Sequence, residues 1–168
     1  MSMNKLSKVV GPPPPDPVIG SAEGWSDVEA MAGTLPSDYV DFARSYGSGC
    51  IAGFFWIFVP GTENDNLDMI EQVDRCKSTV EELRADPNYR LPFRVGTEPG
   101  DLFPVGCTDN GDLLFWQIQG DADHWKTVVL EGRTAQWESF DLPVTGFLAA
   151  ILTGDLSCSF FPKDLSEL

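Results

Sequence analysis

The sequence predicts an α+β fold, a single domain in which an antiparallel meander sheet is flanked by helices. Two patterns predict it. In the first half of the chain, and again near its end, apolar residues recur at the spacing of a helix face. Between these parts, from Pro92 to Glu138, short β-prone segments alternate with turn residues. The length of 168 residues is that of one domain.

The helical pattern is clearest just before residue 47. Pro36 suits the first turn of a helix, and Gly47 and Gly49 accept positive φ, so the helix is expected to end there. The apolar run at 54–59 then predicts a buried strand, which Pro60 ends. The apolar stripe of the helix consists of Leu35, Tyr39, Phe42, Ala43 and Tyr46.

Further helices are expected on both sides of this segment. Ser26 and Glu29 form a capping-box pattern, which predicts a short helix beginning at Ser26. Residues 67–85 predict a longer helix, because apolar residues recur there at helical spacing. A last helix, capped by Ser139 or Asp141, is expected to end at Gly154.

Residues 1–20 are expected to form a flexible leader ahead of the folded domain at 21–168. Four consecutive prolines at 12–15 favour extended polyproline II structure, which has little to bury.

The middle of the chain predicts the meander. Asn110-Gly111 is a strong hairpin signal, because both residues accept the positive φ of a tight turn. Strands are expected before and after it, at 102–107, 113–118 and 125–131, with a short edge strand at 135–138.

The charge balance narrows the classes of partner. The chain carries 26 acidic and 11 basic residues, a formal charge of −15. Nucleic acids and anionic membranes repel such a chain, whereas a basic protein is attracted to it. The first residues lack the apolar stretch of an export signal, so we expect a cytoplasmic protein with four reduced cysteines.

Several segments together resemble the SUKH superfamily, which contains bacterial immunity proteins and fungal cell-wall-synthesis regulators. They are the helix, glycine turn and aromatic strand at 35–60, the Pro-Val-Gly and Asp-x-Gly-Asp pattern at 104–112, and the closing helix at 147–154. The residues that carry the signature are Trp25, Leu35, Pro36, Tyr39, Phe42, Tyr46, Gly47, Gly49, Trp116 and Trp125. The resemblance implies an α+β fold without catalytic residues. It also implies that a bacterial member binds and blocks a toxin, often a nuclease.

Signals for an enzyme or a metal site are weak. His124 is the sole histidine and lies in a turn-like stretch, and Cys107 near it predicts a packed strand residue more readily than a nucleophile. Asp109, Asn110 and Asp112 offer oxygen ligands, but the closing position of a calcium loop would be Gly120 rather than a glutamate. We therefore expect no catalytic residue, no metal and no cofactor.

Two acidic groups, uninterrupted by Lys or Arg, are the expected contacts to a basic partner. An exposed aromatic side chain in the strand at 54–59, Phe55 or Phe58, is expected to anchor the complex, and Phe55 is taken as the candidate. The candidate carboxylates are Glu63, Asp65, Asp68, Glu71 and Asp74 in the first group, and Asp101, Asp109, Asp112, Asp121 and Asp123 in the second.

The function expected from charge and resemblance is that of a non-enzymatic immunity protein, which neutralises a cognate toxin by binding it. The alternative is a regulatory or scaffold module for an endogenous partner, and a small hydrolase is a third, weaker reading. The oligomeric state stays open.

Overall fold

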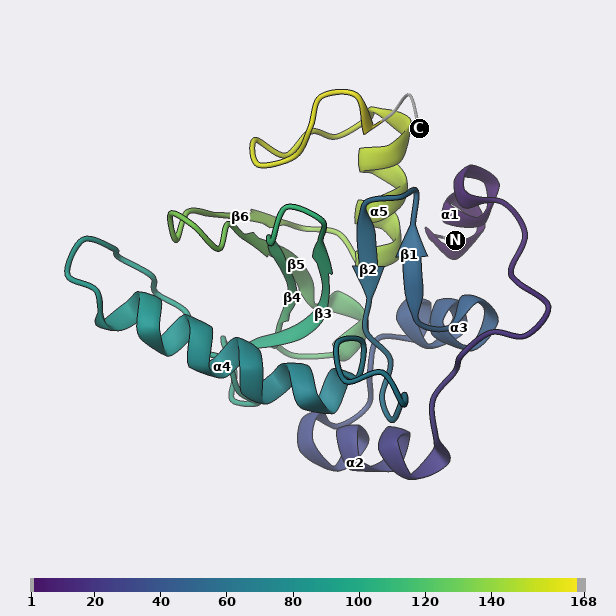
Figure 1. Cartoon of the computed structure of the whole chain (residues 1–168), viewed down its shortest axis with the longest axis horizontal. Coiled ribbons are helices and arrows are strands. Elements are labelled where there is room, and N and C mark those ends of the chain that lie inside the picture. Colours follow the sequence, from purple (N-terminus) through teal and green to yellow (C-terminus); the bar gives the residue numbers. More distant parts are fainter. Residues whose placement is uncertain (1, 166–168) are drawn as a thin grey trace.

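A six-stranded antiparallel sheet runs through the middle of the molecule, with its strands side by side in chain order (Figure 1). The computed structural model describes residues 2–165, and within them the predicted α+β meander is confirmed. The strands are β1 (Gly49–Ile51), β2 (Phe55–Ile57), β3 (Leu102–Thr108), β4 (Leu113–Gln117), β5 (Lys126–Leu130) and β6 (Trp137–Phe140).

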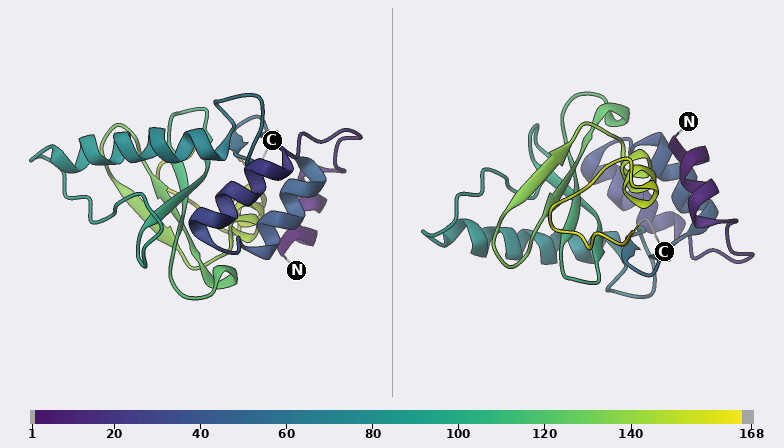
Figure 2. Two further views of the ribbon diagram at one scale, coloured as in Figure 1. Left: turned by 90° about the horizontal axis from the view of Figure 1, so that it is seen from below. Right: turned by 90° about the horizontal axis from the view of Figure 1, so that it is seen from above.

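Helices cover both faces of this sheet. One helix, α4, lies along one face, and the other helices gather on the opposite side (Figure 2). The helices are α1 (Ser2–Val10), α2 (Ala22–Ala32), α3 (Ser37–Tyr46), α4 (Met69–Ala85) and α5 (Val144–Thr153), with a short 3₁₀ helix, η1 (Ala122–His124), between β4 and β5.

The larger core lies between the sheet and α3 and α5. Its centre is Trp116, fully buried, whose ring meets the Tyr39 ring edge to face with centroids 4.8 Å apart. The Tyr39 hydroxyl donates to the Phe58 carbonyl at 2.6 Å, so the one polar atom of this ring is satisfied. Full burial of a large apolar side chain contributes roughly 1.5–3 kcal/mol to the free energy of unfolding. The helix stripe predicted from the sequence therefore forms the main core contact.

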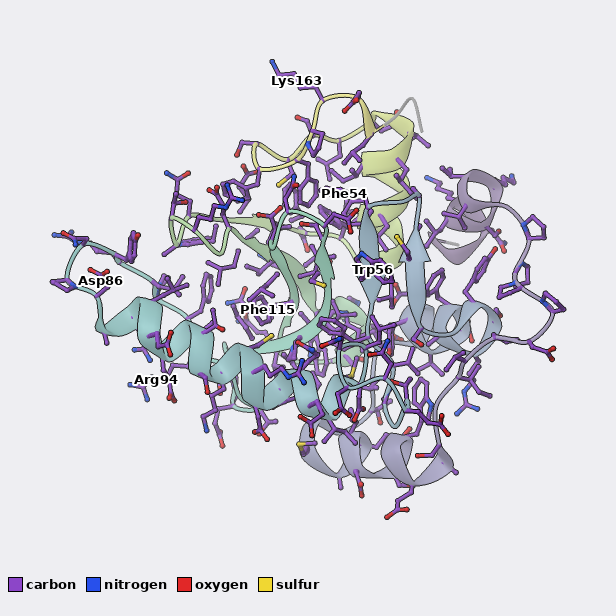
Figure 3. The ribbon with its side chains drawn as sticks, viewed as in Figure 1. Phe54, Trp56, Asp86, Arg94, Phe115 and Lys163 are labelled. Atoms are coloured by element: carbon purple, nitrogen blue, oxygen red, sulfur yellow. The ribbon has the colours of Figure 1, made fainter. Side chains whose placement is uncertain are left out.

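The second core lies beneath α4. Cys76 and Val80 of α4 pack on Phe115 and Val128 of the sheet. Phe115 lies in the interior between the sheet and the helix (Figure 3). These contacts explain why the helix pattern at 67–85 is a correct prediction.

The hairpin β1–β2 differs from the sequence prediction. Gly49 begins β1 instead of only ending a helix, and the strand expected at 54–59 is reduced to β2. Ala52 and Gly53 have φ of 53° and 65°, and the Phe54 N–H donates to the Ile51 carbonyl. This is the geometry of a tight hairpin turn. Alanine is an unusual residue at positive φ, so the sequence Ala52-Gly53 does not predict a hairpin turn.

The expectation of a flexible leader at residues 1–20 is wrong for residues 2–10. They form α1, and Leu6 is fully buried among the residues of the larger core. The Tyr46 hydroxyl donates to the carbonyl of Gly11 and so holds the end of this helix. Pro12 to Pro15 are exposed, as expected. The apolar pattern of α1 is short, and the prolines that follow it favour extended structure, so the sequence gives no clear signal for this helix.

Two helices begin at a proline and are capped by an aspartate from another element. The expected caps Ser139 and Asp141 do not cap α5, whose N-cap is Pro143. Asp38 of α3 accepts instead from the backbone N–H and the hydroxyl of Thr145, at 3.1 and 2.7 Å. In the same way Asp123 accepts from the N–H of Ser37, at 2.7 Å, where α3 begins. Proline carries no capping side chain, so the carboxylate comes from outside the helix.

The cap of α2 also differs from the prediction. Ser21 caps this helix rather than Ser26, and its hydroxyl accepts from the N–H of Gly24 at 3.0 Å. Ser26 lies exposed inside the helix. The helix therefore begins one turn earlier than its capping-box pattern indicated.

Replacing Ala52 by glycine is expected to stabilise the protein by about 1 kcal/mol, because glycine has no Cβ to strain at positive φ. The same substitution at Ala30, exposed in α2, is expected to destabilise it by about 1 kcal/mol. Urea unfolding of Ala52→Gly and Ala30→Gly measures both. Equal effects of the same sign would contradict the turn geometry.

Replacing Asp123 by alanine is expected to cost about 0.5–1 kcal/mol at neutral pH, in the range of an exposed helix cap. Donation by the Ser37 N–H holds the pKa of Asp123 below its usual value. The contribution is therefore complete above the unfolded pKa, about 3.9, and is lost as the pH falls through the folded pKa. Urea unfolding of the native protein and Asp123→Ala should converge at acidic pH, and a constant difference would contradict the cap.

Candidate partner-binding surface

The aromatic anchor predicted from the sequence is not at the surface. Phe55 is fully buried, with its ring edge to face against Phe54 and Phe161 at 5.0 and 5.3 Å. The half-buried ring of β2 is Trp56, whose indole N–H donates to the Asp109 carboxylate at 2.6 Å (Figure 3). The prediction of Phe55 as a contact is therefore wrong, and the alternative Phe58 is excluded as well, because both side chains are buried in the larger core.

The second acidic group serves the fold. Asp112 is buried and its carboxylate accepts from the Thr108 hydroxyl at 2.9 Å, so its prediction as a partner contact is wrong. Burial raises the pKa of Asp112, and the hydrogen bond from Thr108 opposes that shift. The carboxylates of Asp101 and Asp121 accept from the backbone N–H groups of Glu98 and Asp123, and Asp109 and Asp123 have the partners described above.

The first acidic group divides into one structural residue and four exposed ones. Asp68 is the N-cap of α4, and its carboxylate accepts from the N–H groups of Gly61 and Ile70, at 2.9 and 3.3 Å. The remaining carboxylates lie exposed on the loop before α4 and on the outer side of its first turns; they are Glu63, Asp65, Glu71 and Asp74. We call these four the acidic patch.

The loop that carries half of this patch is tied to α4. The Gln72 side-chain amide donates to the carbonyls of Asp65 and Asn66, at 3.4 and 3.0 Å. Arg75 donates to the Asn66 side chain at 2.9 Å. These bonds hold the loop in one position on the helix, although most of it is exposed to solvent.

A groove that the sequence did not reveal lies beside the acidic patch. It has a volume of about 740 Å³ and runs between residues 17–21 and residues 61–67. Val18 and Ile19 line it and are 54% and 41% exposed. They are two of the five large apolar side chains that are exposed within residues 4–165, where the burial of side chains is described. Glu63, of the acidic patch, lines the same groove.

The backbone beneath Val18 and Ile19 is fixed at three points. The Val18 carbonyl accepts from the N–H of Ser48 at 2.8 Å, and the Ile19 carbonyl accepts from the Trp25 indole N–H at 2.6 Å. Ser21 donates its N–H to the Gly61 carbonyl at 3.1 Å. Two exposed aliphatic side chains are thus presented on a segment that has little freedom to lose when a partner binds.

Two glycines permit this arrangement. A Cβ on Gly47 would lie 2.5 Å from the backbone nitrogen of Val18, and a Cβ on Gly20 would overlap the Pro60 carbonyl. Both residues also have positive φ, of 72° and 78°. The prediction that Gly47 ends the helix is confirmed. Because Gly47 has no Cβ, the backbone of Val18 is also able to pack directly against it.

The residues considered for catalysis are far apart. Cys107 pairs with Leu113 at one end of β4, whereas His124 follows the other end of that strand, roughly 15 Å away at strand spacing. Burial, with a smaller contribution from the nearby Asp109 carboxylate, raises the pKa of Cys107 to about 11. Among residues 2–165, no three His, Cys, Asp or Glu side chains are placed to hold a metal ion.

Comparisons of the chain with family models, with curated proteins and with solved structures find no match. Membership of the SUKH superfamily therefore stays a prediction from the sequence. In the part of the chain that the structure describes, no helix has the length and apolar character needed to cross a membrane.

Alkylation of the cysteines with iodoacetamide tests whether any thiol is activated. Cys50 is exposed and should react first at neutral pH, though more slowly than free cysteine, because partial burial and Asp109 raise its pKa. Cys76 and Cys158 are buried, with pKa values raised to about 12, and should react only after unfolding. Rapid labelling of Cys107 in the folded protein, read by mass spectrometry, would contradict a purely structural thiol.

Proposed function

We propose that this protein is a non-enzymatic binding protein that captures a basic protein partner, and that the partner is a toxin which it neutralises. The observation that carries the proposal is the groove of residues 17–21 and 61–67, where Val18 and Ile19 stand exposed on a fixed backbone beside the acidic patch. The resemblance to SUKH immunity proteins supports the toxin as the partner.

The two parts of this surface have different roles in binding. Covering the exposed halves of Val18 and Ile19 contributes roughly 2 kcal/mol, which acts mainly on the dissociation rate. The four carboxylates of the acidic patch, in a chain of charge −15, attract a cationic partner and act mainly on the association rate.

A nuclease is the class of toxin that fits this charge. Its active site carries Lys and Arg side chains that hold phosphates, and these same side chains attract carboxylates. Covering such a site excludes the nucleic acid without any chemical step. This inhibition requires tight binding and no catalytic group on the inhibitor.

Sequencing the neighbouring genes and co-expressing this protein with a toxin encoded there tests the function. Cells that make both proteins should grow, and the purified pair should form a complex in size-exclusion chromatography. Growth arrest despite full expression, together with no complex, would overturn the immunity role. Recovery of a housekeeping protein in place of the toxin would favour the scaffold alternative.

Association kinetics test the role of the acidic patch. The double variant Glu63→Gln, Asp65→Asn should associate roughly tenfold more slowly at low salt, and its rate should depend less on salt. The matched control neutralises Glu81 and Glu82, which are exposed near the C-terminal end of α4. Equal slowing by both pairs would mean that only net charge matters and would reject this patch.

A further inference from the structure

The last helix, α5, has a composition that is typical of full burial. Residues 144–153 include no charged side chain, and seven of the ten are buried. A helix that is apolar on all sides is normally covered on all sides. One side of α5, with Gly146, Ala150 and Thr153, nevertheless lines an open groove.

This groove lies between α1 and α5 and has a volume of about 570 Å³. Its α5 side is shallow, because small residues follow one another along the helix, and Leu142 and Pro143 just before α5 line it as well. Its α1 side carries Val9, which is 40% exposed. Small side chains let another helix approach closely, so the shape suits a helical occupant.

The charges at the rim indicate which occupant fits. Lys5 and Lys8 of α1 line the groove, and Asp155, just after α5, lines it as well. The helices α1 and α5 contain no acidic residue, so like-charge repulsion between two copies of charge −15 is weak on this face. A surface that bears both signs is also able to pair with itself about a two-fold axis.

We infer that this groove is the interface of a symmetric dimer, in which α1 and α5 of one copy pack against α1 and α5 of a second copy. The two-fold axis brings the lysines of each copy to Asp155 of the other, and the apolar sides of both α5 helices are covered. Only two short helices per copy take part, so the dimer forms with micromolar affinity. This inference is independent of the partner-binding groove at residues 17–21.

Sedimentation equilibrium of the full chain tests the dimer. The native protein should shift from monomer to dimer as its concentration rises. Ala150→Arg, which places a long cationic side chain in the groove, should remain monomeric. The matched control Ala30→Arg, exposed on α2, should dimerise like the native protein.

A second variant covers the case in which Ala150→Arg fails to fold. Lys8→Glu lies on the exposed side of α1 and should weaken dimerisation about tenfold, because two attractive pairs per dimer become repulsive. A native protein that is monomeric at every concentration would overturn the inference, as would dimers unaffected by both groove variants. If the native protein is monomeric but binds an acidic amphipathic peptide, and Ala150→Arg abolishes that binding, the groove belongs to a different partner.

Discussion

The candidate binding surface depends on a close contact between backbone segments. Residues 18–21 lie against residues 47–48 on one side and 60–61 on the other, at distances that leave no room for a Cβ at Gly20 or Gly47. The contact joins the start of α2, the end of α3 and the loop before α4. Because it fixes the backbone, Val18 and Ile19 stay in place although their side chains are exposed.

Several carboxylates of this acidic chain accept hydrogen bonds within the fold, so not all of its negative charge is available to a partner. Asp38 and Asp123 cap helices that begin at proline, Asp68 caps α4, and Asp112 is buried under a threonine hydroxyl. Of the ten candidate carboxylates, the four of the acidic patch lie exposed on the loop and first turns of α4. A charge of −15 therefore acts locally, beside an apolar groove, as well as through the overall field.

The sequence predicted the elements that local patterns determine. The stripe from Leu35 to Tyr46, the Asn-Gly hairpin and the Gly154 stop all follow from periodicity or turn chemistry, and the structure has each of them. Side-chain partners distant in sequence escaped prediction: Asp123 lies 86 residues from Ser37, and Asp38 lies 107 from Thr145. The groove escaped for the same reason, since residues 17–21 meet 61–67 only through tertiary packing.

Amide hydrogen exchange of the protein, alone and with the proposed toxin partner, tests the central claim most directly. If the groove beside the acidic patch is the binding site, exchange slows at residues 17–21 and 61–67 when the toxin is added, and stays unchanged in β6. Protection of other surfaces with unchanged exchange in both of these segments would contradict the account.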